Sequence, residues 1–245
     1  MKDLAKANLI ACVAAMAPRP GWEVLREEGL VALKAPSRHP LANFAWGPVS
    51  ERNLELCRAF YGPMPYSWLL APGQDPAGLA ELGFWAADPC PEMVCDLARA
   101  EPLEPVEGVR VVRADREHLV HWEALVGEGF RIPGPDVREF FLPLIEQGGC
   151  VPYLAYHRDR PAATALTFRS QGTLGIYAVA TGRAHRRLGL GQAVIGACVE
   201  EGREAGMAFA TLYSSVMGWP FYERIGFHTE QVLKEFCTAN HPSCI

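Results

Sequence analysis

Hydrophobic and polar residues follow two different periods along the second half of the chain. Short apolar or alternating runs predict strands over 108–113, 151–157, 162–168, 174–181 and 208–214, and from Phe227 onward. Apolar residues at helical spacing predict helices over 117–127, 190–205 and 219–224, and one from Asp136, as its cap, to Ile145. This mixture of strands and helices predicts an α+β fold.

The first half repeats part of this order with shorter elements. Its pattern predicts strands over 22–25, 30–34, 42–46 and 66–70, and helices over 51–60 and 76–82. Leu82-Gly83-Phe84 mirrors Ile225-Gly226-Phe227, and each tripeptide stands where a helix is expected to give way to a strand. The two halves therefore show a faint internal repeat of architecture.

The first residues combine two conflicting patterns. An apolar stretch from Leu9 to Ala17 ends in Ala15-Met16-Ala17, which imitates the cleavage site of a secretory signal. Asp3, however, stands where such a signal is basic, and Leu9, Ile10, Val13 and Ala17 share one helical face. We therefore expect a packed amphipathic helix.

Composition changes near residue 105. Most of the 20 prolines lie before this point and most of the 23 glycines after it. The segment 100–105 is polar and punctuated by prolines, which is typical of a linker. We predict two domains, residues 1–105 and 106–245.

The overall composition narrows the class of protein. Of 245 residues, 49% are hydrophobic and 21% are charged, which suits a globular protein with a sizeable core. A net charge of −5 argues against a basic nucleic-acid-binding surface, and no apolar run approaches a membrane span. The eight cysteines are scattered without a C-x-x-C pair, so we expect reduced thiols in a cytoplasmic protein. We expect no nucleic-acid or membrane partner and leave a homodimer open.

The most informative segment joins the predicted strand 174–181 to the helix beginning at Leu190. It reads Arg186-Arg187-Leu188-Gly189-Leu190-Gly191, and Arg183 precedes it. A helix N-terminus binds phosphate through unpaired N–H groups, and glycines let a diphosphate approach the backbone. A Rossmann fingerprint does not fit, because the loop is long and Val194 fills the third glycine position; a Walker loop lacks its Gly-Lys-Ser/Thr.

These residues resemble a known family. Arg186-x-x-Gly189-x-Gly191 after Val179-Ala180-Thr181 resembles the acetyl-CoA signature of the GNAT-type N-acetyltransferases. The segment 219–227 resembles their common tyrosine-to-Gly-Phe ending, and the order of elements agrees from about residue 107 to 237. The first half resembles a GNAT unit that is degenerate, because no Arg-x-x-Gly-x-Gly motif follows residues 46–51. The resemblance implies two tandem GNAT-like domains, each a mixed, mostly antiparallel sheet flanked by helices.

The resemblance also implies a binding role for particular residues. Backbone groups at Val179 and Thr181 would pair with the thioester carbonyl and the pantetheine arm, between two splayed parallel strands. Amides from Arg187 to Gln192 would hold the pyrophosphate. Ser215 stands where the family often has an Asn that contacts CoA, and Arg183 replaces its usual proline. The implied acetyl-CoA site is Val179, Ala180, Thr181, Arg186, Arg187, Leu188, Gly189, Leu190, Gly191, Gln192, Ser215 and Tyr222.

The implied reaction moves an acetyl group from acetyl-CoA to a primary amine by direct attack. Tyr222 would protonate the departing thiolate as a general acid. Glu128 would lie near the acceptor side, either as a base or as a solvated loop residue. The alternative from another class is a non-catalytic acyl-CoA-binding or regulatory module. No metal is expected, because Glu117, His118 and His121 offer too few ligands in one place.

Overall fold

The computed structural model describes residues 3–16, 19–76 and 78–238. The helices are α1 (Leu4–Ala14), α2 (Glu51–Tyr61), α3 (Leu119–Phe130), α4 (Gly134–Glu146), α5 (Leu190–Glu204) and α6 (Trp219–Arg224), with 3-10 turns η1 (Pro40–Ala42) and η2 (Arg183–His185). The strands are β1 (Glu23–Glu27), β2 (Leu30–Lys34), β3 (Phe44–Trp46), β4 (Ser67–Leu70), β5 (Trp85–Ala86), β6 (Cys90–Asp96), β7 (Val109–Arg113), β8 (Val151–His157), β9 (Arg160–Ser170), β10 (Thr173–Thr181), β11 (Phe209–Tyr213) and β12 (His228–Cys237).

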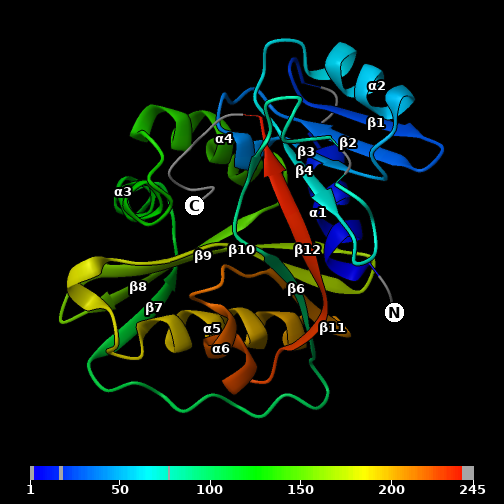
Figure 1. The fold of residues 1–245 in the computed structure, drawn as a ribbon. Helices are drawn as coiled ribbons and strands as arrows, with labels where there is room; N and C mark the ends of the chain where they lie inside the picture. Colours follow the sequence, from blue (N-terminus) through cyan, green and yellow to red (C-terminus); the bar gives the residue numbers. More distant parts are fainter. Residues whose placement is uncertain (1–2, 17–18, 77, 239–245) are drawn as a thin grey trace.

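One mixed, mostly antiparallel sheet runs through both halves of the molecule. Its strand order is β1-β2-β3-β4-β12-β6-β11-β10-β9-β8-β7, and β5 pairs with β12 beside this path. The long strand β12 joins the halves, since its first part pairs with β6 and its last part with β4 (Figure 1). The predicted α+β class and the mixed sheet flanked by helices are confirmed.

The strand β6 belongs to the sheet of the second half although it precedes residue 105. It lies between β11 and β12, where Ala210 pairs with Cys95 and Val232 pairs with Pro91. The segment 97–108 then passes along α5 before β7 begins (Figure 1). The predicted boundary at residue 105 therefore does not divide the sheet, because each half supplies a strand to the other.

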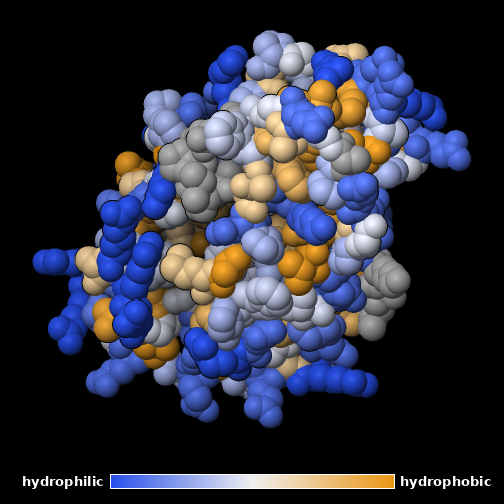
Figure 2. Space-filling view, in the orientation of Figure 1, coloured by the Kyte–Doolittle hydropathy of each residue, from blue (hydrophilic) through white to orange (hydrophobic). Residues whose placement is uncertain are grey.

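Helices cover the two faces of the second half's strands. The first core lies between the strands and α5 and α6, and Leu174, Val194, Cys198 and Leu212 are among its residues. On the opposite face, α1, α3 and α4 pack in a second core that also includes residues of the first half. Hydrophobic side chains surface in the middle of the face shown in Figure 2, between the two halves, while its lower rim is hydrophilic.

The architectural repeat is visible in the backbone. Both β3–α2–β4 and β10–α5–β11 are parallel strand pairs joined by a helix. The amide of Phe84 donates to Leu79 O over 2.9 Å, and that of Phe227 donates to Tyr222 O over 3.0 Å. The glycine before each Phe has a positive φ, 85° and 96° respectively. The same turn therefore precedes a strand in each half.

Three local predictions differ from the structure. Of the segment 76–82, the described residues form turns and not a helix, since Gly78 takes a φ of 75°. Asp136 lies in the first turn of α4, which begins two residues earlier with a proline at its start. The helix α1 forms and buries Ile10 and Val13, but Leu9 is only half-buried and the polar Asn8 is buried, so the expected amphipathic pattern is not observed; Ala17 lies outside the described residues.

None of the helices in the described residues is long and apolar enough to cross a membrane.

Candidate active site

The strands β10 and β11 separate in the middle of the second half's sheet. They run parallel and, within the described chain, pair only over Thr173–Gly175 and Phe209–Thr211. Beyond Gly175, β10 continues to Thr181 alongside β9 on its other side. The side of β10 from Ile176 onward that faces β11 is thus free of strand pairing, which leaves backbone groups for another partner.

A β-bulge shapes β10 at this separation. Its pairing with β9 shifts between Tyr177 and Ala180, and Ala178 has a φ of 50°. Thr164 Oγ1 donates to Ala178 O over 2.9 Å and holds the bulge from β9. The helix α3 packs directly on it, because a Cβ on Gly129 would lie 2.6 Å from the Ala180 Cβ. The bulge is therefore enclosed and reorients the backbone around Val179.

The loop after β10 presents a helix N-terminus beside the bulge. Within it Arg187 and Gly189 have positive φ values of 63° and 78°, and α5 begins at Leu190. Ala193 N donates to Gly189 O over 3.0 Å, so the amides of residues 190–192 precede the first helical bond. Of the two loop glycines, Gly189 has a positive φ, whereas Gly191 has ordinary helical geometry.

Gly191 stands in the first turn of α5 without a side chain in front of the helix start. A Cβ built there would meet Phe221 Cζ at 3.5 Å and Thr181 Oγ1 at 3.9 Å, which are ordinary contacts. Leu188, three residues earlier, is 44% exposed. A side chain at position 191 would therefore fit without a clash in the unliganded protein.

Arginines surround this helix start. Arg183, Arg186 and Arg187 are all exposed. Arg186 Nε donates to Thr181 O over 3.3 Å, and the Arg183 amide donates to Glu128 Oε1 over 2.9 Å. These contacts fix the loop's course, and the three side chains give a positive field in a chain with a net charge of −5.

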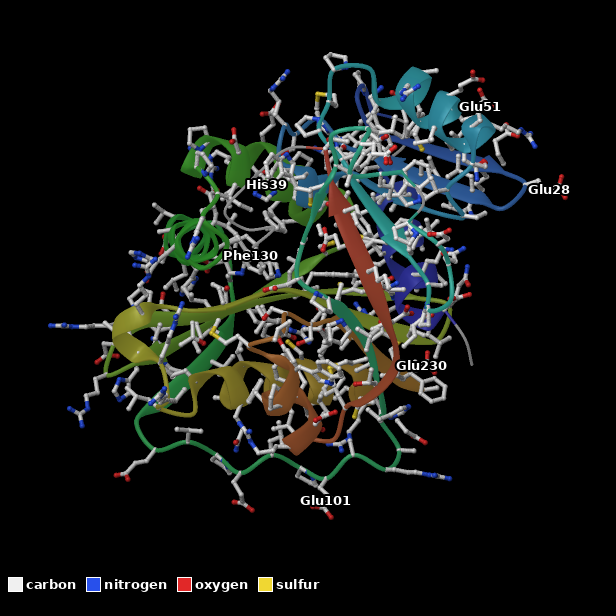
Figure 3. The ribbon with its side chains drawn as sticks, in the orientation of Figure 1. Glu28, His39, Glu51, Glu101, Phe130 and Glu230 are labelled. Atoms are coloured by element: carbon white, nitrogen blue, oxygen red, sulfur yellow. The ribbon has the colours of Figure 1, made fainter. Side chains whose placement is uncertain are left out.

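The segment between β6 and β7 supports the same loop, which the sequence did not indicate. Both methyl groups of Val106 lie near Gly189, at 3.0 and 3.1 Å from where its Cβ would be. Gln192 Nε2 donates to Glu104 O over 3.3 Å, and Arg203 Nε donates to Leu97 O over 3.1 Å. Glu101, labelled in Figure 3, points away from α5. The segment expected to be a linker therefore packs along α5 and contacts the glycine loop at its end.

Tyr222 and Ser215 come together in the turn between β11 and α6. A Cβ on Gly218 would lie 3.1 Å from Tyr222 Cε2 and 3.4 Å from Ser215 Oγ. Ser215 Oγ accepts the Gly218 amide over 3.2 Å, so this side chain already serves its own turn. The Tyr222 ring is buried and packs edge-on to Phe227 at a centroid distance of 5.8 Å. Burial raises the pKa of Tyr222, so its hydroxyl stays protonated at neutral pH.

Glu128 lies near the end of α3, and its carboxylate reaches the loop after β10. Besides accepting the Arg183 amide, this carboxylate lies 4.0 Å from Arg183 Nε, and the Glu128 side chain is 41% exposed. These contacts join α3 to the loop after β10.

The equivalent place in the first half is built differently. Gly47 after β3 has its carbonyl bound by Trp68 Nε1 over 2.8 Å, and a Cβ there would lie 2.4 Å from Gly29 O. Ser50 caps α2 by accepting the Asn53 amide over 3.2 Å, and Glu51 follows in the first turn. Figure 3 shows Glu51 at the outer side of α2. A carboxylate at this helix start disfavours phosphate.

Among the described residues, no three His, Cys, Asp or Glu side chains gather where they could hold a metal ion.

Comparison with known proteins identifies the second half. A family model described as Acetyltransferase (GNAT) family matches residues 117–227. No relative was found among curated proteins.

Several solved structures share the fold over nearly the whole chain. A GCN5-related N-acetyltransferase from Kribbella flavida is 21% identical with a TM-score of 0.67, covering 93% of this chain and 95% of its own. A putative GNAT acetyltransferase from Novosphingobium aromaticivorans is 16% identical with a TM-score of 0.61, covering 94% and 97%. A tandem GNAT protein of the clavulanic acid biosynthesis pathway is 15% identical with a TM-score of 0.61, covering 94% and 88%.

The separated strands, the bulge and the arginine-glycine loop lie within or beside the matched residues, as the sequence resemblance implies. Residues 117–227 of this chain therefore match the GNAT acetyltransferase family, and the solved structures share the fold of the whole.

Proposed function

We propose that the second half of the chain transfers an acetyl group from acetyl-CoA to a primary amine by direct attack. One observation carries the proposal: β10 separates from β11 directly beside the helix start that follows the Arg186–Gly191 loop. The first feature suits an extended arm with a thioester, and the second suits the pyrophosphate of the same molecule.

The phosphate end of the ligand would rest on backbone amides. The N–H groups of residues 190–192 precede the first helical hydrogen bond, and Gly191 carries no side chain that would cover them. Exposed Arg183, Arg186 and Arg187 add charge-assisted attraction. These features support binding of a polyanion at the start of α5.

Bound acetyl-CoA supplies the acyl group as a thioester. The backbone at Val179, next to the Ala178 bulge, is where the resemblance places the N–H donor for the thioester oxygen. The amine nitrogen attacks the carbonyl carbon, the C–S bond breaks, and the amine's proton passes to solvent. Tyr222 gives its proton to the departing thiolate and regains one from solvent after the step.

We propose a different role for the first half. Glu51 occupies the helix start that would face a pyrophosphate, and the Gly47 carbonyl is engaged within the protein. We infer that this half binds no acetyl-CoA and shapes the acceptor side through its helix α1 and the pairing of its strand β4 with β12.

A thiol-release assay with acetyl-CoA and a panel of amines tests the proposal. The panel contains small amines, amino acids, an aminoglycoside and a peptide with a free N-terminus. We expect amine-dependent release of CoA for at least one class, with the acetylated product seen by mass spectrometry. Binding of acetyl-CoA without release for any amine would favour a non-catalytic acyl-CoA-binding module. Absence of binding would refute the site itself.

A further inference from the structure

The first helix of the chain reaches the strand that bears the bulge. Asn8 on α1 is 1% exposed, and its Nδ2 donates to Phe168 O, Thr173 O and Thr173 Oγ1 over 3.3, 3.2 and 2.8 Å. Its Oδ1 accepts the Tyr177 hydroxyl over 2.6 Å. All four bonds end on the β9–β10 hairpin, so both functional groups of Asn8 serve this one contact.

The hairpin is shaped to receive this side chain. A Cβ on Gly175 would lie 2.0 Å from Asn8 Oδ1 and 2.4 Å from Tyr177 Oη. Gly175 also belongs to the last residue pair that joins β10 to β11 before the two strands separate. Asn8 and Tyr177 therefore meet over the point where the proposed thioester groove begins.

Tyr177 directly precedes the strained residue of the bulge. Ala178 has a φ of 50°, which a residue with a side chain adopts only when its surroundings hold it there. Thr164 Oγ1 holds the Ala178 carbonyl from one side. The Asn8–Tyr177 hydrogen bond fixes the residue before it from the other side. The bulge thus has two side-chain supports, and one of them comes from the first half.

We propose that Asn8 is a positioning residue for acetyl transfer, which acts through the Tyr177 hydroxyl to hold the Ala178 bulge and aim the Val179 backbone at the acyl group. This inference rests on the proposed function of the second half. It gives the first half a direct part in the chemistry beyond packing.

If Asn8 served only to hold α1 on the sheet, the expected effects of substitutions would differ. The helix also packs through Ile10, Val13 and Met16, and Cys12 Sγ lies 3.6 Å from Cys150 Sγ at the start of β8. These contacts belong to a core that also includes Ala178 and Tyr177, but none of them uses the Tyr177 hydroxyl as a hydrogen-bond partner. Loss of the Tyr177 hydroxyl therefore leaves α1 attached by the three Asn8 Nδ2 bonds and removes support from the bulge alone.

The test compares Tyr177→Phe and Asn8→Ala with the matched control Cys12→Ala, one turn further along the same buried face of α1. For each variant we measure kcat, the KM for acetyl-CoA, the Kd for CoA, the melting temperature, and hydrogen exchange over residues 176–181. A misdirected donor costs on the order of 10- to 100-fold in kcat. We expect that loss in Tyr177→Phe with the Kd for CoA within about twofold, because the phosphate contacts lie on α5.

We expect Cys12→Ala to lower the melting temperature as much as Tyr177→Phe or more, with kcat and exchange over 176–181 unchanged. Wild-type kcat in both Tyr177→Phe and Asn8→Ala would overturn the inference and leave the proposed function standing. An equal loss of kcat in Cys12→Ala would also overturn it, since docking alone then explains the effect. A wild-type protein without acetyl transfer would refute the proposed function, and this inference with it.

Discussion

Replacing Gly191 with Val separates ligand binding at the start of α5 from folding. The new side chain would stand in front of the amides of residues 190–192. In the unliganded protein its Cβ meets no atom closer than Phe221 Cζ at 3.5 Å, and Gly191 needs no positive φ. We therefore expect a folded protein that has lost the space for a pyrophosphate.

The magnitude follows from linkage between binding and folding. Acetyl-CoA at about 100 times its Kd stabilises the native state by about 2.7 kcal/mol. Unfolding entropy of about 2.1 cal/mol/K per residue converts this to a rise of roughly 5 °C in the melting temperature for 245 residues. Loss of two hydrogen bonds to a charged group, at about 1.5–3 kcal/mol each, weakens binding at least about 100-fold. The same ligand concentration then raises the melting temperature of the variant by less than about 1 °C.

Differential scanning fluorimetry with and without acetyl-CoA measures the shift. The matched control is Gly196→Val, on the same helix, where a Cβ meets only Leu103 Cβ at 3.5 Å and Cδ1 at 3.7 Å. We expect this control to keep the wild-type shift. A folded Gly191→Val protein with an undiminished shift would contradict the assignment of the helix start to the ligand's phosphates.

Three further predictions concern other residues. Tyr222→Phe keeps the buried ring and removes the proton donor, so we expect kcat to fall about 100-fold with little change in the Kd for acetyl-CoA; the reverse pattern would make Tyr222 a binding contact. In both proteins kcat should rise with pH, because the acceptor amine attacks only after it has lost its proton. Glu128→Gln retains an oxygen for the Arg183 amide and should keep kcat within about threefold, whereas an equal large loss in Glu128→Gln and Glu128→Ala would identify Glu128 as the base. Burial raises the pKa of the Glu92 carboxyl in the folded state, so the protein loses stability as the pH rises from the unfolded-state pKa to the folded-state pKa of this group. Melting temperatures of wild type and Glu92→Gln at pH 5 and pH 8 should therefore show the variant gaining stability relative to wild type as pH rises. A difference that stays constant with pH would exclude this reasoning.

Much of the second half could be predicted because its apolar residues keep a regular period. The helix 219–224 forms with the predicted bounds, and the strands 151–157 and 173–181 agree within one residue. The loop after β10 could be identified because arginines and glycines before a helix start are the residues that a phosphate-binding loop needs. These local signals need no knowledge of distant parts of the chain.

The features that cross between the halves gave no such signal. The strand β6 carries Pro91 and a buried Glu92, which contradict the pattern of a central strand, and its pairing with β11 and β12 is a long-range event. Asn8 interrupts the apolar face of α1 and finds its partners 160 to 169 residues away. Val106 and Gly189 are also far apart in the sequence, so composition alone suggested a simple linker before β7.

Isothermal titration calorimetry with acetyl-CoA tests the central claim, that the second half alone holds the acyl donor at the start of α5. Wild-type protein should bind one acetyl-CoA per chain, in competition with CoA, and Gly191→Val should bind it at least about 100-fold more weakly. Two equivalent sites per chain, or one site that Gly191→Val leaves intact, would contradict the account.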